Sequence, residues 1–143
     1  MAQTESPAVT QAVLQQWMDA SPFIRFCQMK VTSVDADAGV VEMTMPLLEP
    51  LARDAEHRQF HGGPIASFID TAGDFAVAVK AGGGVPTINF RVDYLRPAGG
   101  TGLRAVATAR RVGRTVGVAD VDVFDDQGRL VAVGRGCYSG QPG

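Results

Sequence analysis

The stretch His61-Gly62-Gly63-Pro64-Ile65-Ala66-Ser67-Phe68-Ile69-Asp70-Thr71-Ala72 decides how this chain folds. Pro64 follows two glycines, and proline is favoured at the first position of a helix, where its missing N–H is not needed. Apolar residues then recur at helical spacing at Ile65, Phe68, Ile69, Ala72, Phe75, Ala76 and Val79. The other faces are nearly as apolar, which is typical of a buried helix. The sequence therefore predicts a buried helix from Pro64 to about Lys80, ended by the glycines at 82–84.

Asp70 lies inside this helix, away from both ends. A buried carboxylate without a partner is costly, so Asp70 needs either a structural hydrogen bond, for example to local backbone or Thr71, or a functional role. Asp74 follows one turn later and is a possible second carboxylate. A solvated or capping position is the simpler interpretation of Asp74.

The regions on both sides of this helix carry strand patterns. We expect a short amphipathic helix over 10–20, a loop over 46–60, and strands over 28–34, 40–45, 87–94, 103–111, 115–124 and 129–138. One sheet with one apolar helix across it is an α+β arrangement. Such a sheet has two edges and one uncovered face, which favours pairing with a second copy. The 143 residues are expected to form a single domain with a flexible N-terminus at residues 1–9.

The composition excludes several classes of function. Apolar residues make up 45% and charged residues 20% of the chain, and the net charge of −2 gives no electrostatic case for nucleic acid or a membrane surface. The N-terminus lacks the pattern of a signal peptide, and no apolar run approaches the ~20 residues that span a bilayer. Cys27 and Cys137 form neither a disulfide framework nor a zinc motif. These features predict a soluble, cytoplasmic protein.

Arginine accounts for eleven of the thirteen cationic residues. Six of the arginines fall in one stretch: Arg91, Arg96, Arg104, Arg110, Arg111 and Arg114. Arginine suits bidentate contact with phosphate better than lysine does. Exposed strand faces account for most of these side chains, and we expect two or three of them to contact a ligand.

Four segments in order carry a family resemblance over about residues 23–138. They are His61-Gly62-Gly63 with Ile69-Asp70-Thr71-Ala72, then Asn89-Phe90-Arg91-Val92-Asp93-Tyr94-Leu95-Arg96-Pro97-Ala98, then Val112-Gly113-Arg114-Thr115, and last Gly128-Arg129-Leu130-Val131-Ala132. This set resembles the hotdog-fold acyl-CoA thioesterases, in particular their phenylacetate-degradation (PaaI-type) branch. The resemblance implies an α+β hotdog fold, in which one antiparallel sheet wraps around the long helix. It also implies an acyl-CoA substrate and no separate cofactor.

The resemblance assigns catalytic roles to four positions. Asp70 takes the place of the catalytic carboxylate, and Gly62 that of the residue whose backbone N–H polarises the thioester carbonyl. Thr87 occupies the position of an assisting hydroxyl at the head of the next strand. His61 belongs to the same motif, and we expect it to fix the loop through a backbone hydrogen bond. A metal pair with His57 would need a continuous helix, so no metal site is expected.

Substrate contacts are expected at five further positions. The glycine–arginine pair that ends in Arg114 often lies near the coenzyme A phosphates in this family. Gly63, Asn89, Arg96 and Arg111 complete the expected set.

The chain departs from the family pattern at two positions before the histidine. The family usually carries an asparagine where this chain has Ala55, and a glycine where it has Arg58. That asparagine helps to position water or the thioester oxygen. Asp54, Glu56 and His57 are the nearby side chains that could replace it.

The spacing of Gly62 and Asp70 adds a physical constraint. Eight residues of helix separate them by about 12 Å. An oxyanion donor must lie ~3 Å from its oxygen, and a base must be within hydrogen-bond reach of the attacking water. One helix cannot do both for one carbonyl, whereas two antiparallel helices from two subunits can. We therefore expect a dimer as the minimal active unit, with a tetramer as the larger alternative.

Several alternatives stay open at this point. Asp70 could act as a nucleophile that forms an anhydride or as a general base. A hotdog hydratase would need a histidine after Asp70 on the helix, and none follows. A non-catalytic acyl-CoA binding or regulatory module is favoured by Ala55 in place of asparagine. The acyl group is not predicted, because the phenylalanines that could line an apolar or aryl pocket also suit a core: Phe23, Phe26, Phe60, Phe68 and Phe75.

Overall fold

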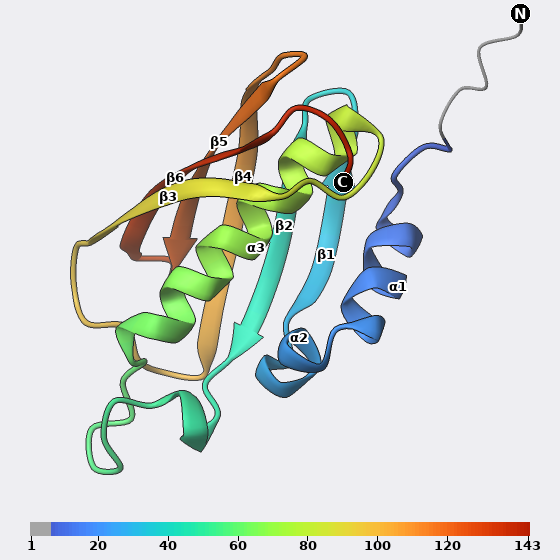
Figure 1. Cartoon of the computed structure of the whole chain (residues 1–143). Coiled ribbons are helices and arrows are strands. Elements are labelled where there is room, and N and C mark those ends of the chain that lie inside the picture. Colours follow the sequence, from blue (N-terminus) through green and yellow to red (C-terminus); the bar gives the residue numbers. More distant parts are fainter. Residues whose placement is uncertain (1–6) are drawn as a thin grey trace, which may run out of the picture.

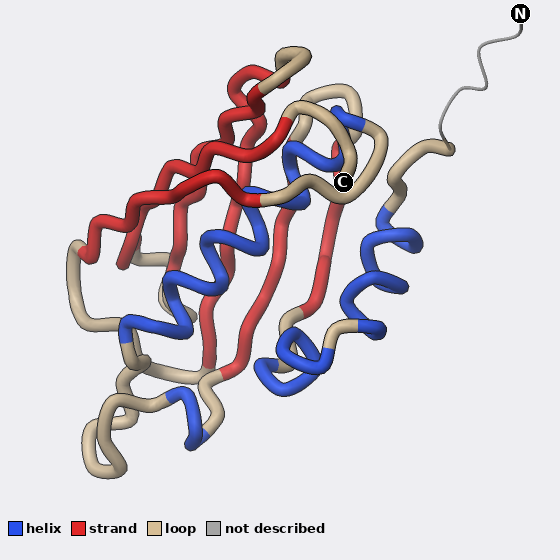
Figure 2. Tube along the Cα trace, viewed as in Figure 1, coloured by secondary structure: helices blue, strands red, loops and turns tan. Residues whose placement is uncertain are grey.

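The computed structural model describes residues 7–143, so the flexible stretch expected at residues 1–9 lies mostly outside the described residues. In chain order the elements are α1 (Gln11–Ala20), α2 (Pro22–Cys27), β1 (Lys30–Asp35), β2 (Val40–Pro46), the 3-10 helix η1 (Glu49–Leu51), α3 (Gly62–Ala81), β3 (Thr87–Tyr94), β4 (Gly102–Val112), β5 (Val116–Phe124) and β6 (Leu130–Ser139). Figure 2 distinguishes the helices from the strands. The six strands form one antiparallel sheet in the order β1-β2-β4-β5-β6-β3.

The long helix α3 lies along the concave side of this sheet (Figure 1). It contacts β2, β3, β4, β5 and β6, because nearly every side of it is apolar. Phe68, Ile69 and Ala72 are completely buried between helix and sheet. The predicted α+β fold, with one antiparallel sheet wrapped around a buried helix, is confirmed.

The start of α3 differs from the prediction by two residues. The helix begins at Gly62, and Pro64 is its third residue rather than its first. His61 is the N-cap, and its ring Nδ1 accepts the N–H of Gly63 at 3.0 Å. Proline is tolerated anywhere in the first turn, where backbone N–H groups have no partner within the helix. Histidine is not among the usual capping residues, so position 61 carries no recognisable N-cap signal.

The N-terminal region contains a second helix that the sequence analysis missed. Ser21 ends α1, as predicted, but its Oγ also accepts the N–H of Ile24 at 3.3 Å and so caps α2. Pro22 is the first residue of α2, the position that proline favours. Gln28 then adopts a left-handed φ of 55°, and β1 begins at Lys30 instead of Gln28.

The two edges of the sheet have different surroundings. α1 contacts the edge strand β1, whereas β3 has no strand beyond it within residues 7–143. Three side chains of β3 are large, apolar and exposed: Ile88 by 56%, Phe90 by 39% and Tyr94 by 53%. An edge with free backbone groups and apolar side chains is a template for pairing with another chain.

Candidate active site

Asp70 is held on the side of α3 that faces β3 and β6. The hydroxyl of Thr87, the first residue of β3, donates to Oδ1 of Asp70 at 3.0 Å. The hydroxyl of Tyr138 on β6 donates to the backbone carbonyl of Asp70 at 3.0 Å. The carboxylate is half-buried. The structure thus brings together Asp70 and Thr87, two of the predicted catalytic residues.

Tyr138 is a residue of this site that the sequence analysis missed. Its side chain is completely buried, and burial raises the pKa of its hydroxyl far above the usual range. Gly73 and Gly136 make room for the ring, because a Cβ on either residue would collide with it. The sequence does contain one signal for this role: a tyrosine at the end of an apolar strand is expected to be buried, and its hydroxyl then needs a hydrogen-bond partner.

The two helix carboxylates have raised pKa values. Burial raises the pKa of Asp70, although hydrogen bonds from Thr87 and Tyr138 act in the opposite direction. Burial also raises the pKa of Asp74 to about 7, and the neighbouring charge of Asp70 adds to this shift. Only the backbone N–H of Val85 opposes it. The expectation of a solvated or capping Asp74 is therefore wrong, because the residue lies half-buried in the C-terminal part of α3.

A second group of predicted residues surrounds the N-terminus of α3. A surface cavity of about 620 Å³ lies there, and its lining includes His61, Gly62, Tyr94 and Arg96. The hydroxyl of Tyr94 donates to the carbonyl of Gly62 at 2.7 Å. The N–H of Gly62 itself has no acceptor within the described part of the chain. A free backbone donor therefore lies beside a cavity at the positive end of a helix.

His61 has the loop-fixing hydrogen bond that the sequence predicted, since its Nδ1 accepts from Gly63. The same bond occupies the N–H of Gly63, which is therefore not available to a substrate. Gly63 can therefore contribute to substrate binding only by its lack of a side chain, which leaves space beside the backbone.

The other predicted substrate contacts lie in separate places. A register shift between Thr87 and Asn89 turns Asn89 to the convex face of the sheet, away from Asp70. Arg111 lies near the end of β4 and Arg114 in the β4–β5 turn, close to the point where Gly117 of β5 packs against Val77 of α3. Val77 is 15 residues after Gly62, or about 22 Å along the helix. Of the three arginines expected to contact substrate, Arg96 lines the same cavity as Gly62.

Gly62 and Asp70 are also separate within one chain. Both lie on the continuous helix α3, so the predicted separation of about 12 Å holds. The described chain therefore contains two half-sites: a backbone donor beside a cavity, and a carboxylate held by a threonine.

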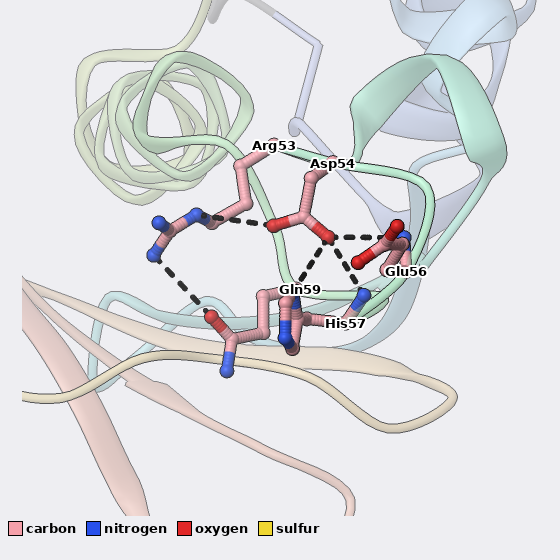
Figure 3. A network of polar contacts seen from close by, with 5 residues as sticks. All are labelled: Arg53, Asp54, Glu56, His57 and Gln59. Carbon is pink, nitrogen blue, oxygen red and sulfur yellow. Dashed lines mark hydrogen bonds and ion pairs between the residues drawn. The ribbon is translucent and has the colours of Figure 1, made fainter.

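The loop before α3 is closed by its own polar side chains (Figure 3). Oδ1 of Asp54 accepts the backbone N–H groups of Glu56 at 3.1 Å and His57 at 2.6 Å, and contacts the His57 ring at 3.1 Å. The backbone N–H of His57 is the main reason why the pKa of Asp54 lies below its usual range. Arg53 completes the network by contacting Asp54 and Gln59. Asp54 and His57, two candidates to replace the family's asparagine, thus bind each other.

Arg58, which stands where the family usually has a glycine, has a left-handed backbone conformation. Its φ is 46°, in the left-handed region where glycine has no steric cost. A residue with a side chain therefore occupies a left-handed position in the loop before α3.

Two further observations bear on metals and membranes. Among residues 7–143, no group of three or more His, Cys, Asp or Glu side chains is arranged to hold a metal ion. None of the helices in that same range combines the length and the apolar character needed to cross a membrane.

Comparison with known proteins places this geometry in a family. A sequence model described as Thioesterase superfamily matches residues 59–132. A Halobacterium salinarum protein provisionally named an esterase is 37% identical over 138 residues, which cover 89% of each chain. The acyl-coenzyme A thioesterase PaaI of Escherichia coli is 32% identical over 105 residues, 72% of each chain.

Solved structures agree with the sequence comparisons. The crystal structure of a protein described as from the thioesterase superfamily has a TM-score of 0.84 and 35% identity, covering 90% of this chain and 96% of that one. The structure of E. coli PaaI has a TM-score of 0.77 and 25% identity, covering 92% of this chain and 95% of that one. These similarities confirm the hotdog fold that the four sequence segments implied.

Proposed function

The chain belongs to the thioesterase superfamily, and we propose that it is an acyl-CoA thioesterase of the PaaI type, which hydrolyses an acyl- or aryl-CoA ester to the free acid and coenzyme A. The similarity to E. coli PaaI supports this substrate class. The observation that carries the proposal is the half-buried carboxylate of Asp70, oriented by Thr87 on the side of α3 that faces β3 and β6. A buried charge with a specific hydrogen-bond donor and a raised pKa is typical of a catalytic group.

In the proposed reaction, Asp70 and the Gly62 N–H act on opposite sides of the thioester carbonyl. As a general base, Asp70 takes a proton from water while the water oxygen attacks the carbonyl carbon. The Gly62 N–H and the positive end of α3 stabilise the oxyanion that forms. When the C–S bond breaks, the proton held by Asp70 passes to the coenzyme A thiolate. As a nucleophile, Asp70 would attack the carbon itself, and the C–S bond would break to release the coenzyme A thiolate. Water would then cleave the resulting anhydride, which regenerates the Asp70 carboxylate and releases the acid, and the proton left over would pass to the thiolate.

The two half-sites require a second copy of the chain. We place it along the free edge of β3, where antiparallel pairing would cover Ile88, Phe90 and Tyr94 and align two α3 helices antiparallel. Such a two-fold axis sets Gly62 of one copy opposite Asp70 of the other. The assembly is then a dimer or a dimer of dimers, with two identical sites per dimer.

The arginines divide between the two copies in this arrangement. Arg96 accompanies the Gly62 that binds the carbonyl, while Arg111 and Arg114 belong to the copy that supplies Asp70. We propose that Arg114 contacts a phosphate of coenzyme A, which a planar guanidinium can bind bidentately.

A second candidate function is a non-catalytic acyl-CoA binding module. Ala55 replaces the family's asparagine, and Asp54 and His57 are bound to each other rather than free to replace it. Turnover of a panel of acyl- and aryl-CoA esters separates the two functions. Hydrolysis of at least one ester, lost in a folded Asp70→Ala variant, supports the enzyme. Binding of CoA esters by calorimetry without hydrolysis of any of them would support the binding module.

A further inference from the structure

Asp74 lies one helical turn after Asp70 on the same side of α3, and the proposed reaction does not use it. Residues four apart on a helix have Cβ atoms about 6 Å from each other. We call the four side chains gathered here between α3, β3 and β6 the seam: Asp70, Asp74, Thr87 and Tyr138. Both carboxylates of the seam are half-buried.

The groups that face Asp74 leave its charge without compensation. Asp70 faces it from its own helix, and the buried Tyr138 hydroxyl from β6. The loop before β3 contributes only the backbone N–H of Val85. Within residues 7–143, no lysine, arginine or histidine acts on it. Asp70, in contrast, has a hydroxyl donor in Thr87.

We propose that Asp74 is a proton-holding positioning residue, which stays neutral when the site is active and so confines the negative charge of the seam to Asp70. Two carboxylates that share a poorly solvated site do not ionise together easily, and the one with the weaker hydrogen bonding keeps the proton. A pKa of about 7 agrees with this assignment. The inference rests on the proposed function, because it concerns how Asp70 works.

The charge state of Asp74 matters because the reaction develops negative charge. When Asp74 ionises, a second anion lies about 6 Å from Asp70, the group that acts on the substrate. Like charges at this distance in a partly dry site oppose each other appreciably. The rate should therefore fall as the pH rises through the pKa of Asp74, in addition to the acid limb that belongs to Asp70.

The test is the pH profile of kcat between pH 6 and 9 for the wild type and Asp74→Asn, after subtraction of spontaneous thioester hydrolysis. Asparagine has the shape of a neutral aspartate but cannot ionise. We expect the ratio of variant to wild-type kcat to rise about threefold or more across this range. Asp37→Asn is the matched control, because Asp37 is exposed in the β1–β2 turn. Its ratio should stay constant with pH.

A second measurement does not depend on turnover. The ¹³C carboxyl resonance of Asp74, assigned by its loss in Asp74→Asn, should titrate near pH 7 in the wild type. In the proposed dimer, the loop that carries His57 and Arg58 approaches Asp74 from the second copy. If that loop supplied a compensating cation, the resonance would titrate below about pH 5, and the proposal would be overturned.

The two readouts separate this inference from the proposed function. A constant ratio of kcat values across the pH range overturns the role of Asp74 while leaving the thioesterase intact. A wild type that hydrolyses no CoA ester contradicts the proposed function, and the resonance of Asp74 still decides whether it holds a proton at neutral pH.

Discussion

Asp120 on the convex face of the sheet and Asp74 on the concave side are the same residue type in opposite surroundings. Asp120 is bound by Arg135 through contacts of 2.6 and 2.9 Å and by Arg110 at 2.8 Å. These two arginines, Arg135 above all, lower the pKa of Asp120 to about 2. Within residues 7–143 Asp74 has no such cation, and burial raises its pKa to about 7.

We interpret this difference as a structural use of charge on the convex face and, under the proposed function, a functional one in the seam. On the convex face, Asp120 gains from its two arginines, and its ionisation favours the fold. In the seam, ionisation is unfavourable to the fold, since burial is the main cause of the shift at both Asp70 and Asp74. Proteins tolerate such unfavourable groups mainly where they serve a function.

The test with the largest expected effect replaces one carboxylate on each face with asparagine. Asp70→Asn should lower kcat by at least about 100-fold, because it removes the base or nucleophile. Asp120→Asn should change kcat by less than about twofold, since its partners are structural. Steady-state kinetics on a CoA ester, with circular dichroism to verify folding, measures both. Equal effects in the two variants would remove the functional distinction between the faces.

The arginines permit the same comparison. Arg114→Ala should raise KM for the CoA ester about ten- to a hundredfold, because one charge-assisted phosphate contact is worth about 1.5–3 kcal/mol. kcat should hardly change, because the phosphates are remote from the carbonyl. Arg110→Ala, whose side chain binds Asp120, should leave KM unchanged. If Arg114→Ala also raised KM for a short thioester that lacks the nucleotide, the role of Arg114 would be structural.

Stability should depend on pH in opposite directions on the two faces. The folded chain holds a proton on Asp74 up to about pH 7, whereas the unfolded chain releases it near the ordinary value of 3.8. The free energy of unfolding should therefore fall as the pH rises from about 4 to 7. Asp74→Asn should restore about 1–3 kcal/mol at pH 8 and much less at pH 4.5. Urea unfolding at the two pH values measures this; equal gains at both would exclude a titrating Asp74.

The convex face should show the smaller and opposite effect. The pKa of Asp120 is lowered, so its contribution is present above about pH 4 and is lost as the pH falls through about 2. Because both arginines are more than half exposed, solvent reduces this contribution. Asp120→Asn should cost about 0.5–1 kcal/mol at pH 7. A gain in stability from this variant would contradict the assignment of the pair as structural.

The sequence predicted the features that local pattern determines. The apolar spacing of α3, its glycine end and the alternation in the strands gave the fold, and the family motif placed Asp70 and Thr87 together. Tyr138 was missed because its hydrogen bond joins residues 68 positions apart in the chain. The burial of Asp74 was missed for the same reason, since it depends on packing of α3 against β6 and the loop at Val85.

The helix starts show where local signals mislead. The Ser21-Pro22 pair predicts the end of α1, but a serine before a proline is also a common start of a helix, and here it starts α2. Asn89 belongs to the segment that carries the family resemblance, but the register shift in β3 turns it to the convex face, and a break in strand register leaves no signal in the local pattern.

The central claim is that one site takes its backbone donor from one chain and its carboxylate from another. Gly62→Pro tests the donor, because it removes the N–H itself at the first helical position, which proline favours. His61 already has the extended ψ of 149° that a residue before proline requires. Gly62→Ala is the matched control, since it adds a side chain but keeps the N–H. Gly62→Pro and Asp70→Ala should each be inactive alone.

The decisive measurement is the activity of these two variants after they are unfolded, mixed in equal amounts and refolded together. Random pairing makes half of the dimers mixed, and each mixed dimer has one intact site, so about a quarter of the wild-type activity should return. Refolding each variant separately should restore nothing. A mixture that exchanges subunits, as followed by mass spectrometry, but stays as inactive as its parents would contradict a site shared between two chains.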